Sequence, residues 1–148
     1  MSTERPSPEE STLRAANDAL YTAIQDMDMA AMTAVWAGRR QDVCVHPGWE
    51  PLSGWLEIRE SWRAIFANTG FMRFTTNDVA VEVLGQVGRV SCTENILSVA
   101  GIRTAHSQVA ATNLFLLTDA GWKLILHHGS PVATHQSIDE LDLDAPTN

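Results

Sequence analysis

The spacing of hydrophobic residues changes once along the chain, at about Gly70. Before that point, apolar residues recur every three or four positions, which places them on one face of a helix. The first run predicts a helix over residues 8–27, because Ser7 can cap its start, Pro8 suits the first helical position and Glu10 completes a capping box. The apolar stripe of this helix consists of Leu13, Ala16, Leu20, Ala23 and Ile24.

Two further helices are predicted in the same half of the chain. Asp28 can cap a shorter helix that ends near Gly38. Residues 55–67 form the third, whose apolar positions follow helical spacing. Between these two helices, residues 42–46 are typical of a short strand, which Pro47 ends. The apolar face of the third helix holds Trp55, Ile58, Trp62, Ile65 and Phe66.

The second half of the chain alternates apolar and polar residues with a period of two, which indicates strands. The connecting segments are short enough for antiparallel hairpins. Three helices and a short strand followed by a meander predict an α+β fold, in which helices cover one face of a curved sheet. The predicted meander strands are residues 71–84, 89–99, 103–117 and 122–128.

Polar residues interrupt one apolar face of the last predicted hairpin. If residues 118–121 form its turn, Asn113 lies opposite Leu126 and Ala111 lies opposite His128. Directly opposed residues share a face of an antiparallel pair. Asn113 and His128 are therefore predicted to point to the apolar side of the sheet.

The preceding hairpin places a carboxylate on an apolar face. Counting outward from residues 85–88 sets Glu94 opposite Val79. A buried polar group without a partner costs about 1–3 kcal/mol, so such residues are either satisfied within the core or line a cavity. Several of them together, with His46 at the end of a strand, favour a cavity. Three tryptophans either form an apolar wall of this cavity or simply fill the core: Trp36, Trp55 and Trp62.

The charge balance narrows the range of partners. The chain has 10 basic and 18 acidic residues, a formal net charge of −8. Nucleic acid and anionic membrane surfaces are therefore disfavoured as partners. We predict one domain over residues 1–130, followed by an acidic, flexible tail over residues 131–148. The chain shows no secretory signal and no apolar run long enough to span a membrane, which predicts a cytoplasmic location.

Cysteines and histidines give little sign of a metal or a disulfide. Cys44 and Cys92 lie in apolar strand-like segments without basic neighbours, which favours small core residues over a disulfide or a catalytic thiol. His127 and His128 would point to opposite faces of a strand, and the other histidines are isolated. We therefore predict no metal site and no cofactor.

Five segments together resemble a known family: residues 31–36, 43–48, 52–55 with 58–62, 111–115 and 121–128. Their order and spacing are similar to those of the SnoaL-like and ketosteroid-isomerase-like branch of the nuclear transport factor 2-like superfamily. The resemblance implies a cone-shaped, curved antiparallel sheet wrapped by three N-terminal helices, the cystatin-like or nuclear transport factor 2-like fold. It also implies a pocket inside the cone and a homodimer formed through the sheet.

The resemblance also assigns roles to individual residues. In the isomerases the general-base aspartate precedes a proline at the end of the first strand, and His46 occupies that place here. The buried acid that donates to the oxyanion lies two residues before the position of Phe115, which is Asn113 in this chain. The tyrosine of the first helix falls at Leu20, one position before Tyr21.

Two functions follow as hypotheses. The first is acid–base chemistry, of the isomerase, dehydratase, cyclase or epoxide hydrolase type, on a neutral and partly apolar small molecule. His46 would move protons, Asn113 would donate to an oxyanion, and Glu94 or His128 would be a second acid–base group. The substrate-binding wall would consist of Trp36, Trp55, Trp62 and Phe115.

The alternative is a non-catalytic domain that binds a ligand or associates as a homodimer. Fold does not fix function, and the superfamily contains such members. The opposite face of the last hairpin supports association, because it is too apolar to be left in water. Its residues are Thr112, Leu114, Leu116, Lys123, Ile125 and His127.

Overall fold

The computed structural model describes residues 5–133, and its three helices form where helical spacing predicts them. They are α1 (Pro8–Gln25), α2 (Met29–Val35) and α3 (Trp55–Ala67). The predicted capping box begins α1. This helix ends before the predicted boundary, because Met27 takes a left-handed conformation with φ 51°. Asp28 then caps α2 by accepting a hydrogen bond from the N–H of Ala31 at 3.0 Å.

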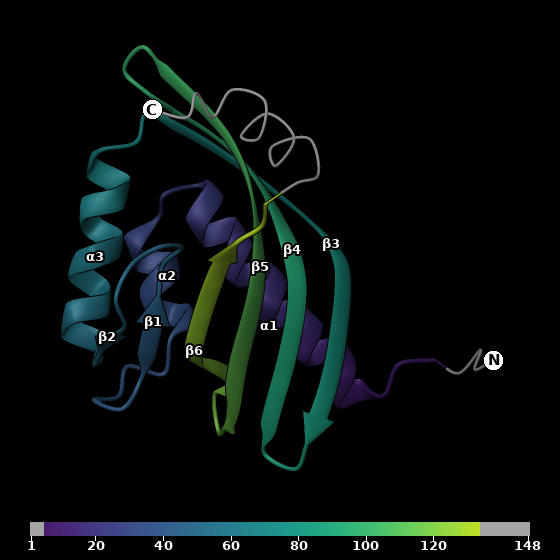
Figure 1. Cartoon of the computed structure of the whole chain (residues 1–148). Helices are drawn as coiled ribbons and strands as arrows, with labels where there is room; N and C mark the ends of the chain where they lie inside the picture. Colours follow the sequence, from purple (N-terminus) through teal and green to yellow (C-terminus); the bar gives the residue numbers. More distant parts are fainter. Residues whose placement is uncertain (1–4, 134–148) are drawn as a thin grey trace.

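Six strands form one sheet in the order β2-β1-β6-β5-β4-β3 (Figure 1). All neighbouring pairs of strands are antiparallel except β1 and β6, which run parallel to each other. The sheet is therefore mixed, with the predicted antiparallel meander as its main part, and the two-residue β2 was not predicted. The strands are β1 (Val43–Val45), β2 (Leu52–Ser53), β3 (Phe71–Leu84), β4 (Val87–Ala100), β5 (Arg103–Thr118) and β6 (Gly121–Pro131).

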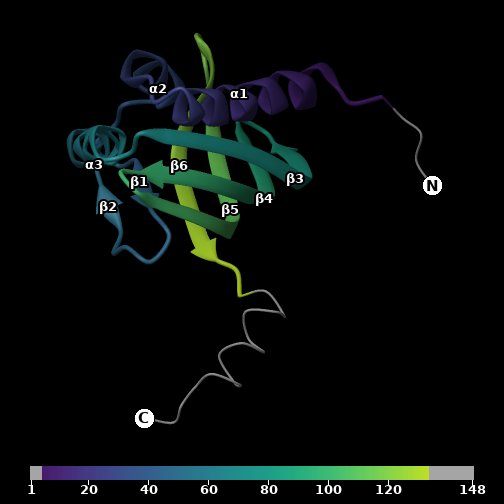
Figure 2. The same cartoon turned by 90° about the horizontal axis from the view of Figure 1, so that it is seen from above.

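The helices lie on one side of the bent sheet, as the α+β prediction required. Figure 2 shows α1 running across the long strands, while α3 lies at the end of the sheet near β1 and β2. The core between α1 and the sheet includes Leu13, Leu20 and Phe115, all fully buried. Gly88 allows this close packing, because a Cβ atom there would lie 2.5 Å from a methyl carbon of Leu13.

The hairpin of β3 and β4 has a tighter turn than predicted. Leu84 pairs with Val87, so only two residues form the turn, and Glu94 pairs with Thr76 instead of Val79. The shorter turn shifts the pairing by two positions. A register irregularity at Asp78, which has φ 56°, shifts it by one more. Glu94 nevertheless points inward and is 2% exposed.

The hairpin of β5 and β6 follows the predicted register only near its turn. Phe115 pairs with Leu124 as predicted, but a bulge at the next position shifts the rest of β6 by one residue. Asn113 therefore pairs with His127 and not with Leu126. The inward placement of His128 was wrong, because the bulge turns it to the exposed face and buries His127 in its place.

Cys44 and Cys92 are both free and buried, as predicted for small core residues. No helix within residues 5–133 is long and apolar enough to cross a membrane. Most of the predicted tail, from residue 134 onward, lies outside the described residues.

Candidate functional site

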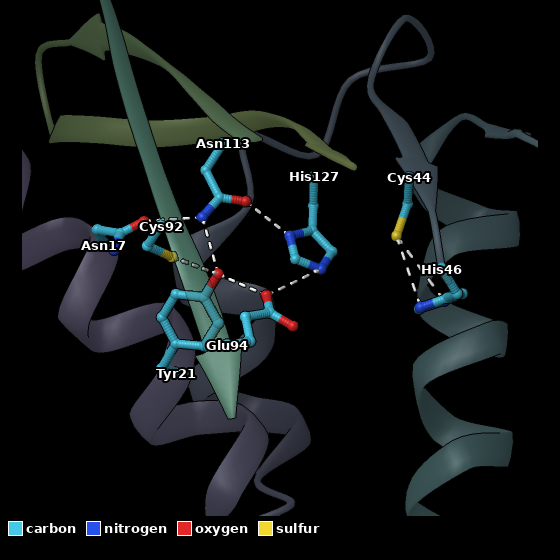
Figure 3. A network of polar contacts seen from close by, with 8 residues as sticks. All are labelled: Asn17, Tyr21, Cys44, His46, Cys92, Glu94, Asn113 and His127. Atoms are coloured by element: carbon cyan, nitrogen blue, oxygen red, sulfur yellow. Dashed lines mark hydrogen bonds and ion pairs between the residues drawn. The ribbon is translucent and has the colours of Figure 1, made fainter. Parts of the chain in front are cut away.

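A buried hydrogen bond joins α1 to the sheet at the centre of the candidate site (Figure 3). The Tyr21 hydroxyl donates to Glu94 Oε2 at 2.6 Å. Asn113 Nδ2 donates to the same hydroxyl oxygen at 3.1 Å. The hydroxyl also lies 3.5 Å from Cys92 Sγ. Side chains from three elements, α1, β4 and β5, therefore meet in a single cluster.

Asn113 lies in the middle of this cluster, and both its amide nitrogen and its amide oxygen make contacts there. Its Nδ2 group donates one proton to Asn17 Oδ1 at 2.8 Å and the other to Tyr21. Its Oδ1 atom lies 2.6 Å from His127 Nδ1. Both amide protons are thus engaged within the protein, which leaves none for the oxyanion that the sequence-based hypothesis assigned to Asn113.

The orientation of Asn113 assigns the tautomer of His127. An amide oxygen only accepts, so His127 Nδ1 carries the proton and Nε2 carries the lone pair. Nε2 lies 4.0 Å from Glu94 Oε2. Burial lowers the pKa of His127 to about 3. The imidazole is consequently neutral at pH 7, and the contact with Glu94 is not an ion pair.

Burial raises the pKa of Glu94 toward neutral pH, where a carboxyl group can both accept and donate a proton. Loss of solvent raises it from 4.5 to about 7, although the hydrogen bond from Tyr21 lowers it. Burial and the nearby carboxylate raise the pKa of Tyr21, so its hydroxyl remains a donor. Glu94 therefore populates both its charged and its neutral form near pH 7.

His46 lies in the same interior but makes a separate set of contacts. Its Nε2 atom lies 2.8 Å from Ser61 Oγ, whose own proton is donated to the backbone oxygen of Ile58 at 2.7 Å. Ser61 must therefore accept, which assigns the proton of His46 to Nε2. Cys44 Sγ lies 3.7 Å from that atom. Burial lowers the pKa of His46 to about 4, so this histidine is also neutral at pH 7.

Trp62 bridges the two histidines. Its ring centroid lies 4.7 Å from that of His46 and 6.0 Å from that of His127. The other predicted wall residues lie in different surroundings, since Trp36 packs against Trp55 with centroids 6.0 Å apart and Phe115 is in the core. Among the described residues, the indole nitrogen of Trp62 is buried without a hydrogen-bond partner.

The hollows described on the surface do not include the cavity that was predicted in the interior. A hollow of about 530 Å³ lies around Asn95 and Gln108. Asn95 is next to Glu94 in the same strand, so its side chain points to the opposite face of the sheet. A cavity among the interior residues therefore remains a prediction. Within residues 5–133, no three His, Cys, Asp or Glu side chains are grouped so that they could hold a metal ion.

Sequence reasoning missed Asn17, Tyr21 and His127 as site residues. Asn17 and Tyr21 are four positions apart and extend the apolar stripe of α1, a spacing that places them on the same face. The resemblance had placed the helix-one tyrosine at Leu20, whereas the hydroxyl that reaches Glu94 belongs to Tyr21. His127 was missed because the bulge in β6 decides which of two adjacent histidines points inward, and the sequence does not specify on which side of them it falls.

Comparisons with known proteins agree with this architecture. A family model described as SnoaL-like domain matches residues 13–134. A candidate dehydratase of the NTF2-like family from Streptomyces avermitilis has a similar structure, with 39% identity, a TM-score of 0.82 and coverage of 88% of this chain and 100% of the other. A candidate association domain of calcium/calmodulin-dependent protein kinase type II from Thiobacillus denitrificans is 30% identical, with a TM-score of 0.68 and coverage of 88% and 99%.

A plant protein shares part of this sequence. The F-box protein SKIP8 from Arabidopsis thaliana is 26% identical over 114 residues, which are 77% of this chain and 47% of that protein. The chain thus spans about half the length of this curated relative.

Proposed function

The chain belongs to the SnoaL-like domain family, and from this premise we propose that it carries out acid–base chemistry with Glu94 on a neutral, partly apolar small molecule. The observation that supports the proposal most directly is the buried Tyr21–Glu94 hydrogen bond of 2.6 Å. Burial brings the pKa of Glu94 to about 7. A carboxyl group with this pKa can both take up and release a proton under physiological conditions.

The charges around Glu94 favour a neutral substrate. No lysine or arginine within residues 5–133 hydrogen-bonds to the cluster, and His46 and His127 are both neutral at pH 7. An anionic substrate would therefore meet a carboxylate without a compensating cation. Trp62, between the two histidines, supplies an apolar surface.

In this proposal, the catalytic roles of several residues differ from those predicted from the sequence. With a pKa of about 4 and its Nε2 proton donated to Ser61 Oγ, His46 is a weaker base at pH 7 than Glu94. Asn113 is a positioning residue in this proposal, because its amide protons are engaged. His128 has no role, since it is exposed on the other face. Of the reaction types considered, elimination of water is favoured by the 39% identity to the candidate dehydratase from Streptomyces avermitilis.

Ring opening of 5-nitrobenzisoxazole tests the proposal, since that reaction needs only the removal of one proton by a base. The wild-type rate should rise with pH around an apparent pKa of about 7. Glu94→Gln should lower the rate by about 100-fold or more. Glu82→Gln is the matched control, because Glu82 is exposed and pairs with Arg89. Equal rates for wild type and Glu94→Gln, or no turnover above buffer, would refute the proposal.

Association is a second candidate function. The 30% identity to the candidate association domain from Thiobacillus denitrificans favours it. The surface that could pair two copies is the outer face of β5 and β6, where Leu114, Leu116 and Ile125 are only half-buried. Light scattering tests this, since the mass of a dimer supports it and the mass of one chain refutes it. A cytoplasmic location and the exclusion of nucleic-acid and membrane partners rest on composition and remain predictions.

A further inference from the structure

Two acceptor atoms face each other in the interior without touching. His127 Nε2 holds a lone pair, because Asn113 fixes the proton on Nδ1. Glu94 Oε2 lies 4.0 Å away, too far for a direct hydrogen bond. Within the described residues, His127 Nε2 forms no hydrogen bond. The pair is therefore separated by a gap that one additional atom can bridge.

The size of this gap matches a hydroxyl group. If an oxygen atom lies about 2.8 Å from each of two atoms that are 4.0 Å apart, its two contacts form an angle of about 90° at the oxygen. This angle is near the one between the O–H bond of an alcohol and one of its lone pairs. When Glu94 is protonated, the hydroxyl can donate to His127 Nε2 and accept from the carboxyl. A ketone oxygen could accept from Glu94, but it would place its lone pairs against that of His127.

We propose that Glu94 and His127 together bind the hydroxyl group of a neutral alcohol, and that Asn113 positions His127 for this by fixing its tautomer. The inference rests on the proposed function, because it names the chemical class of the molecule on which Glu94 acts. Several titratable groups face the carboxyl: Tyr21 from α1, Cys92 from β4 and His127 from β6, with Cys44 of β1 in electrostatic range. Between pH 7 and about pH 4, burial keeps these four groups neutral, so Glu94 is the group among them that changes its charge.

The tautomer can be tested without a ligand or a variant. In protein labelled with ¹⁵N histidine, two-bond correlations distinguish a protonated from an unprotonated ring nitrogen. His127 should show a proton on Nδ1 and a lone pair on Nε2 throughout pH 5–8. A proton on Nε2, or a charged ring at pH 7, would overturn the proposal.

Binding of two matched probes tests the hydroxyl site itself. At pH 6, where Glu94 is protonated, 1-phenylethanol should bind about tenfold more tightly than acetophenone, because only the alcohol satisfies His127. His127→Phe should abolish this preference, and His128→Phe, the exposed neighbour, should retain it. Equal affinity for both probes, or binding of neither, would overturn the proposal. Should His127→Phe fail to fold, the tautomer and the wild-type preference still decide the question.

Glu94→Gln separates this inference from the proposed function. Its amide NH₂ can replace the carboxyl O–H as donor when the Tyr21 hydroxyl turns to Cys92 Sγ, 3.5 Å away, so the preference for the alcohol should persist while proton transfer is lost. A preference for the alcohol without wild-type turnover would support the hydroxyl site and refute the acid–base function. Turnover without the preference would refute the hydroxyl site and leave the acid–base function standing.

Discussion

Replacing Glu94 by glutamine should change the pH dependence of stability in a defined direction. Glu94 is 2% exposed, and burial raises its pKa from 4.5 to about 7. The folded state thus holds this proton at pH values where the unfolded chain has released it. The protonated carboxyl contributes its full stability below pH 4.5, and the contribution is lost as the pH rises to about 7. The difference between these pKa values corresponds to about 3 kcal/mol.

The two buried histidines act in the opposite direction. Burial lowers the pKa of His46 to about 4 and that of His127 to about 3, from 6.5. Their contribution is present above pH 6.5 and is lost as the pH falls toward these values. The wild-type curve therefore combines opposing effects. The difference between wild type and Glu94→Gln isolates the carboxyl group, because both proteins keep the two histidines.

Urea denaturation between pH 5 and 8 provides the measurement. The free energy of unfolding of wild type minus that of Glu94→Gln should fall by about 2–3 kcal/mol over this range. The exposed control Glu82→Gln should give a difference that stays within about 0.5 kcal/mol. A Glu94→Gln difference that is flat, or that rises with pH, would show that the pKa of Glu94 is not raised in the folded protein.

Three further variants test the surroundings of Glu94. Tyr21→Phe should raise the pKa of Glu94 further, because it removes the hydrogen bond that favours the charged form; a ¹³C titration of the carboxyl in which the pKa falls would contradict this. Asn113→Leu should lower the free energy of unfolding by about 3 kcal/mol or more in urea denaturation, since it leaves the Nδ1 proton of buried His127 unpaired; a loss below about 1 kcal/mol would contradict the buried network. His128→Ala should change stability by no more than about 0.5 kcal/mol and leave activity intact, and a loss of activity would return His128 to the site.

The helices and the fold class could be predicted from the sequence because their signals are local. Helix α3 begins at Trp55 and ends at Ala67, as its apolar spacing predicts, and the capping residues that begin α1 are read directly from four positions. The strand β2 has two residues and exists only through its pairing with β1. Pairing between distant segments has no local signal, so β2 and the parallel contact of β1 with β6 could not be predicted.

The site was predicted only in part, because register depends on single residues. The alternation in β6 breaks down after Leu124, where two apolar residues precede two histidines. Either histidine could then point inward, and the bulge decides for His127. Glu94 was placed on the correct face although its partner was wrong, because the shorter turn shifts the pairing by two residues, which preserves the face, and the irregularity at Asp78 adds one residue to β3 and not to β4. Asn113 lies on β5, the strand without the extra residue, so its inward placement is confirmed although its partner on β6 changed.

The balance of donors and acceptors distinguishes a site from a satisfied polar core. Asn17, Tyr21, Glu94, Asn113 and His127 each interrupt an apolar face, and each would cost about 1–3 kcal/mol if buried alone. Four of their protons reach acceptors: the tyrosine proton, both Asn113 protons and the His127 Nδ1 proton. Acceptors are left over among the described residues, since His127 Nε2 and Glu94 Oε1 receive no hydrogen bond, and Figure 3 shows Oε1 pointing away from Tyr21. A cluster that only stabilised the core would pair these atoms as well, so the two unpaired acceptors favour a ligand that brings its own donor.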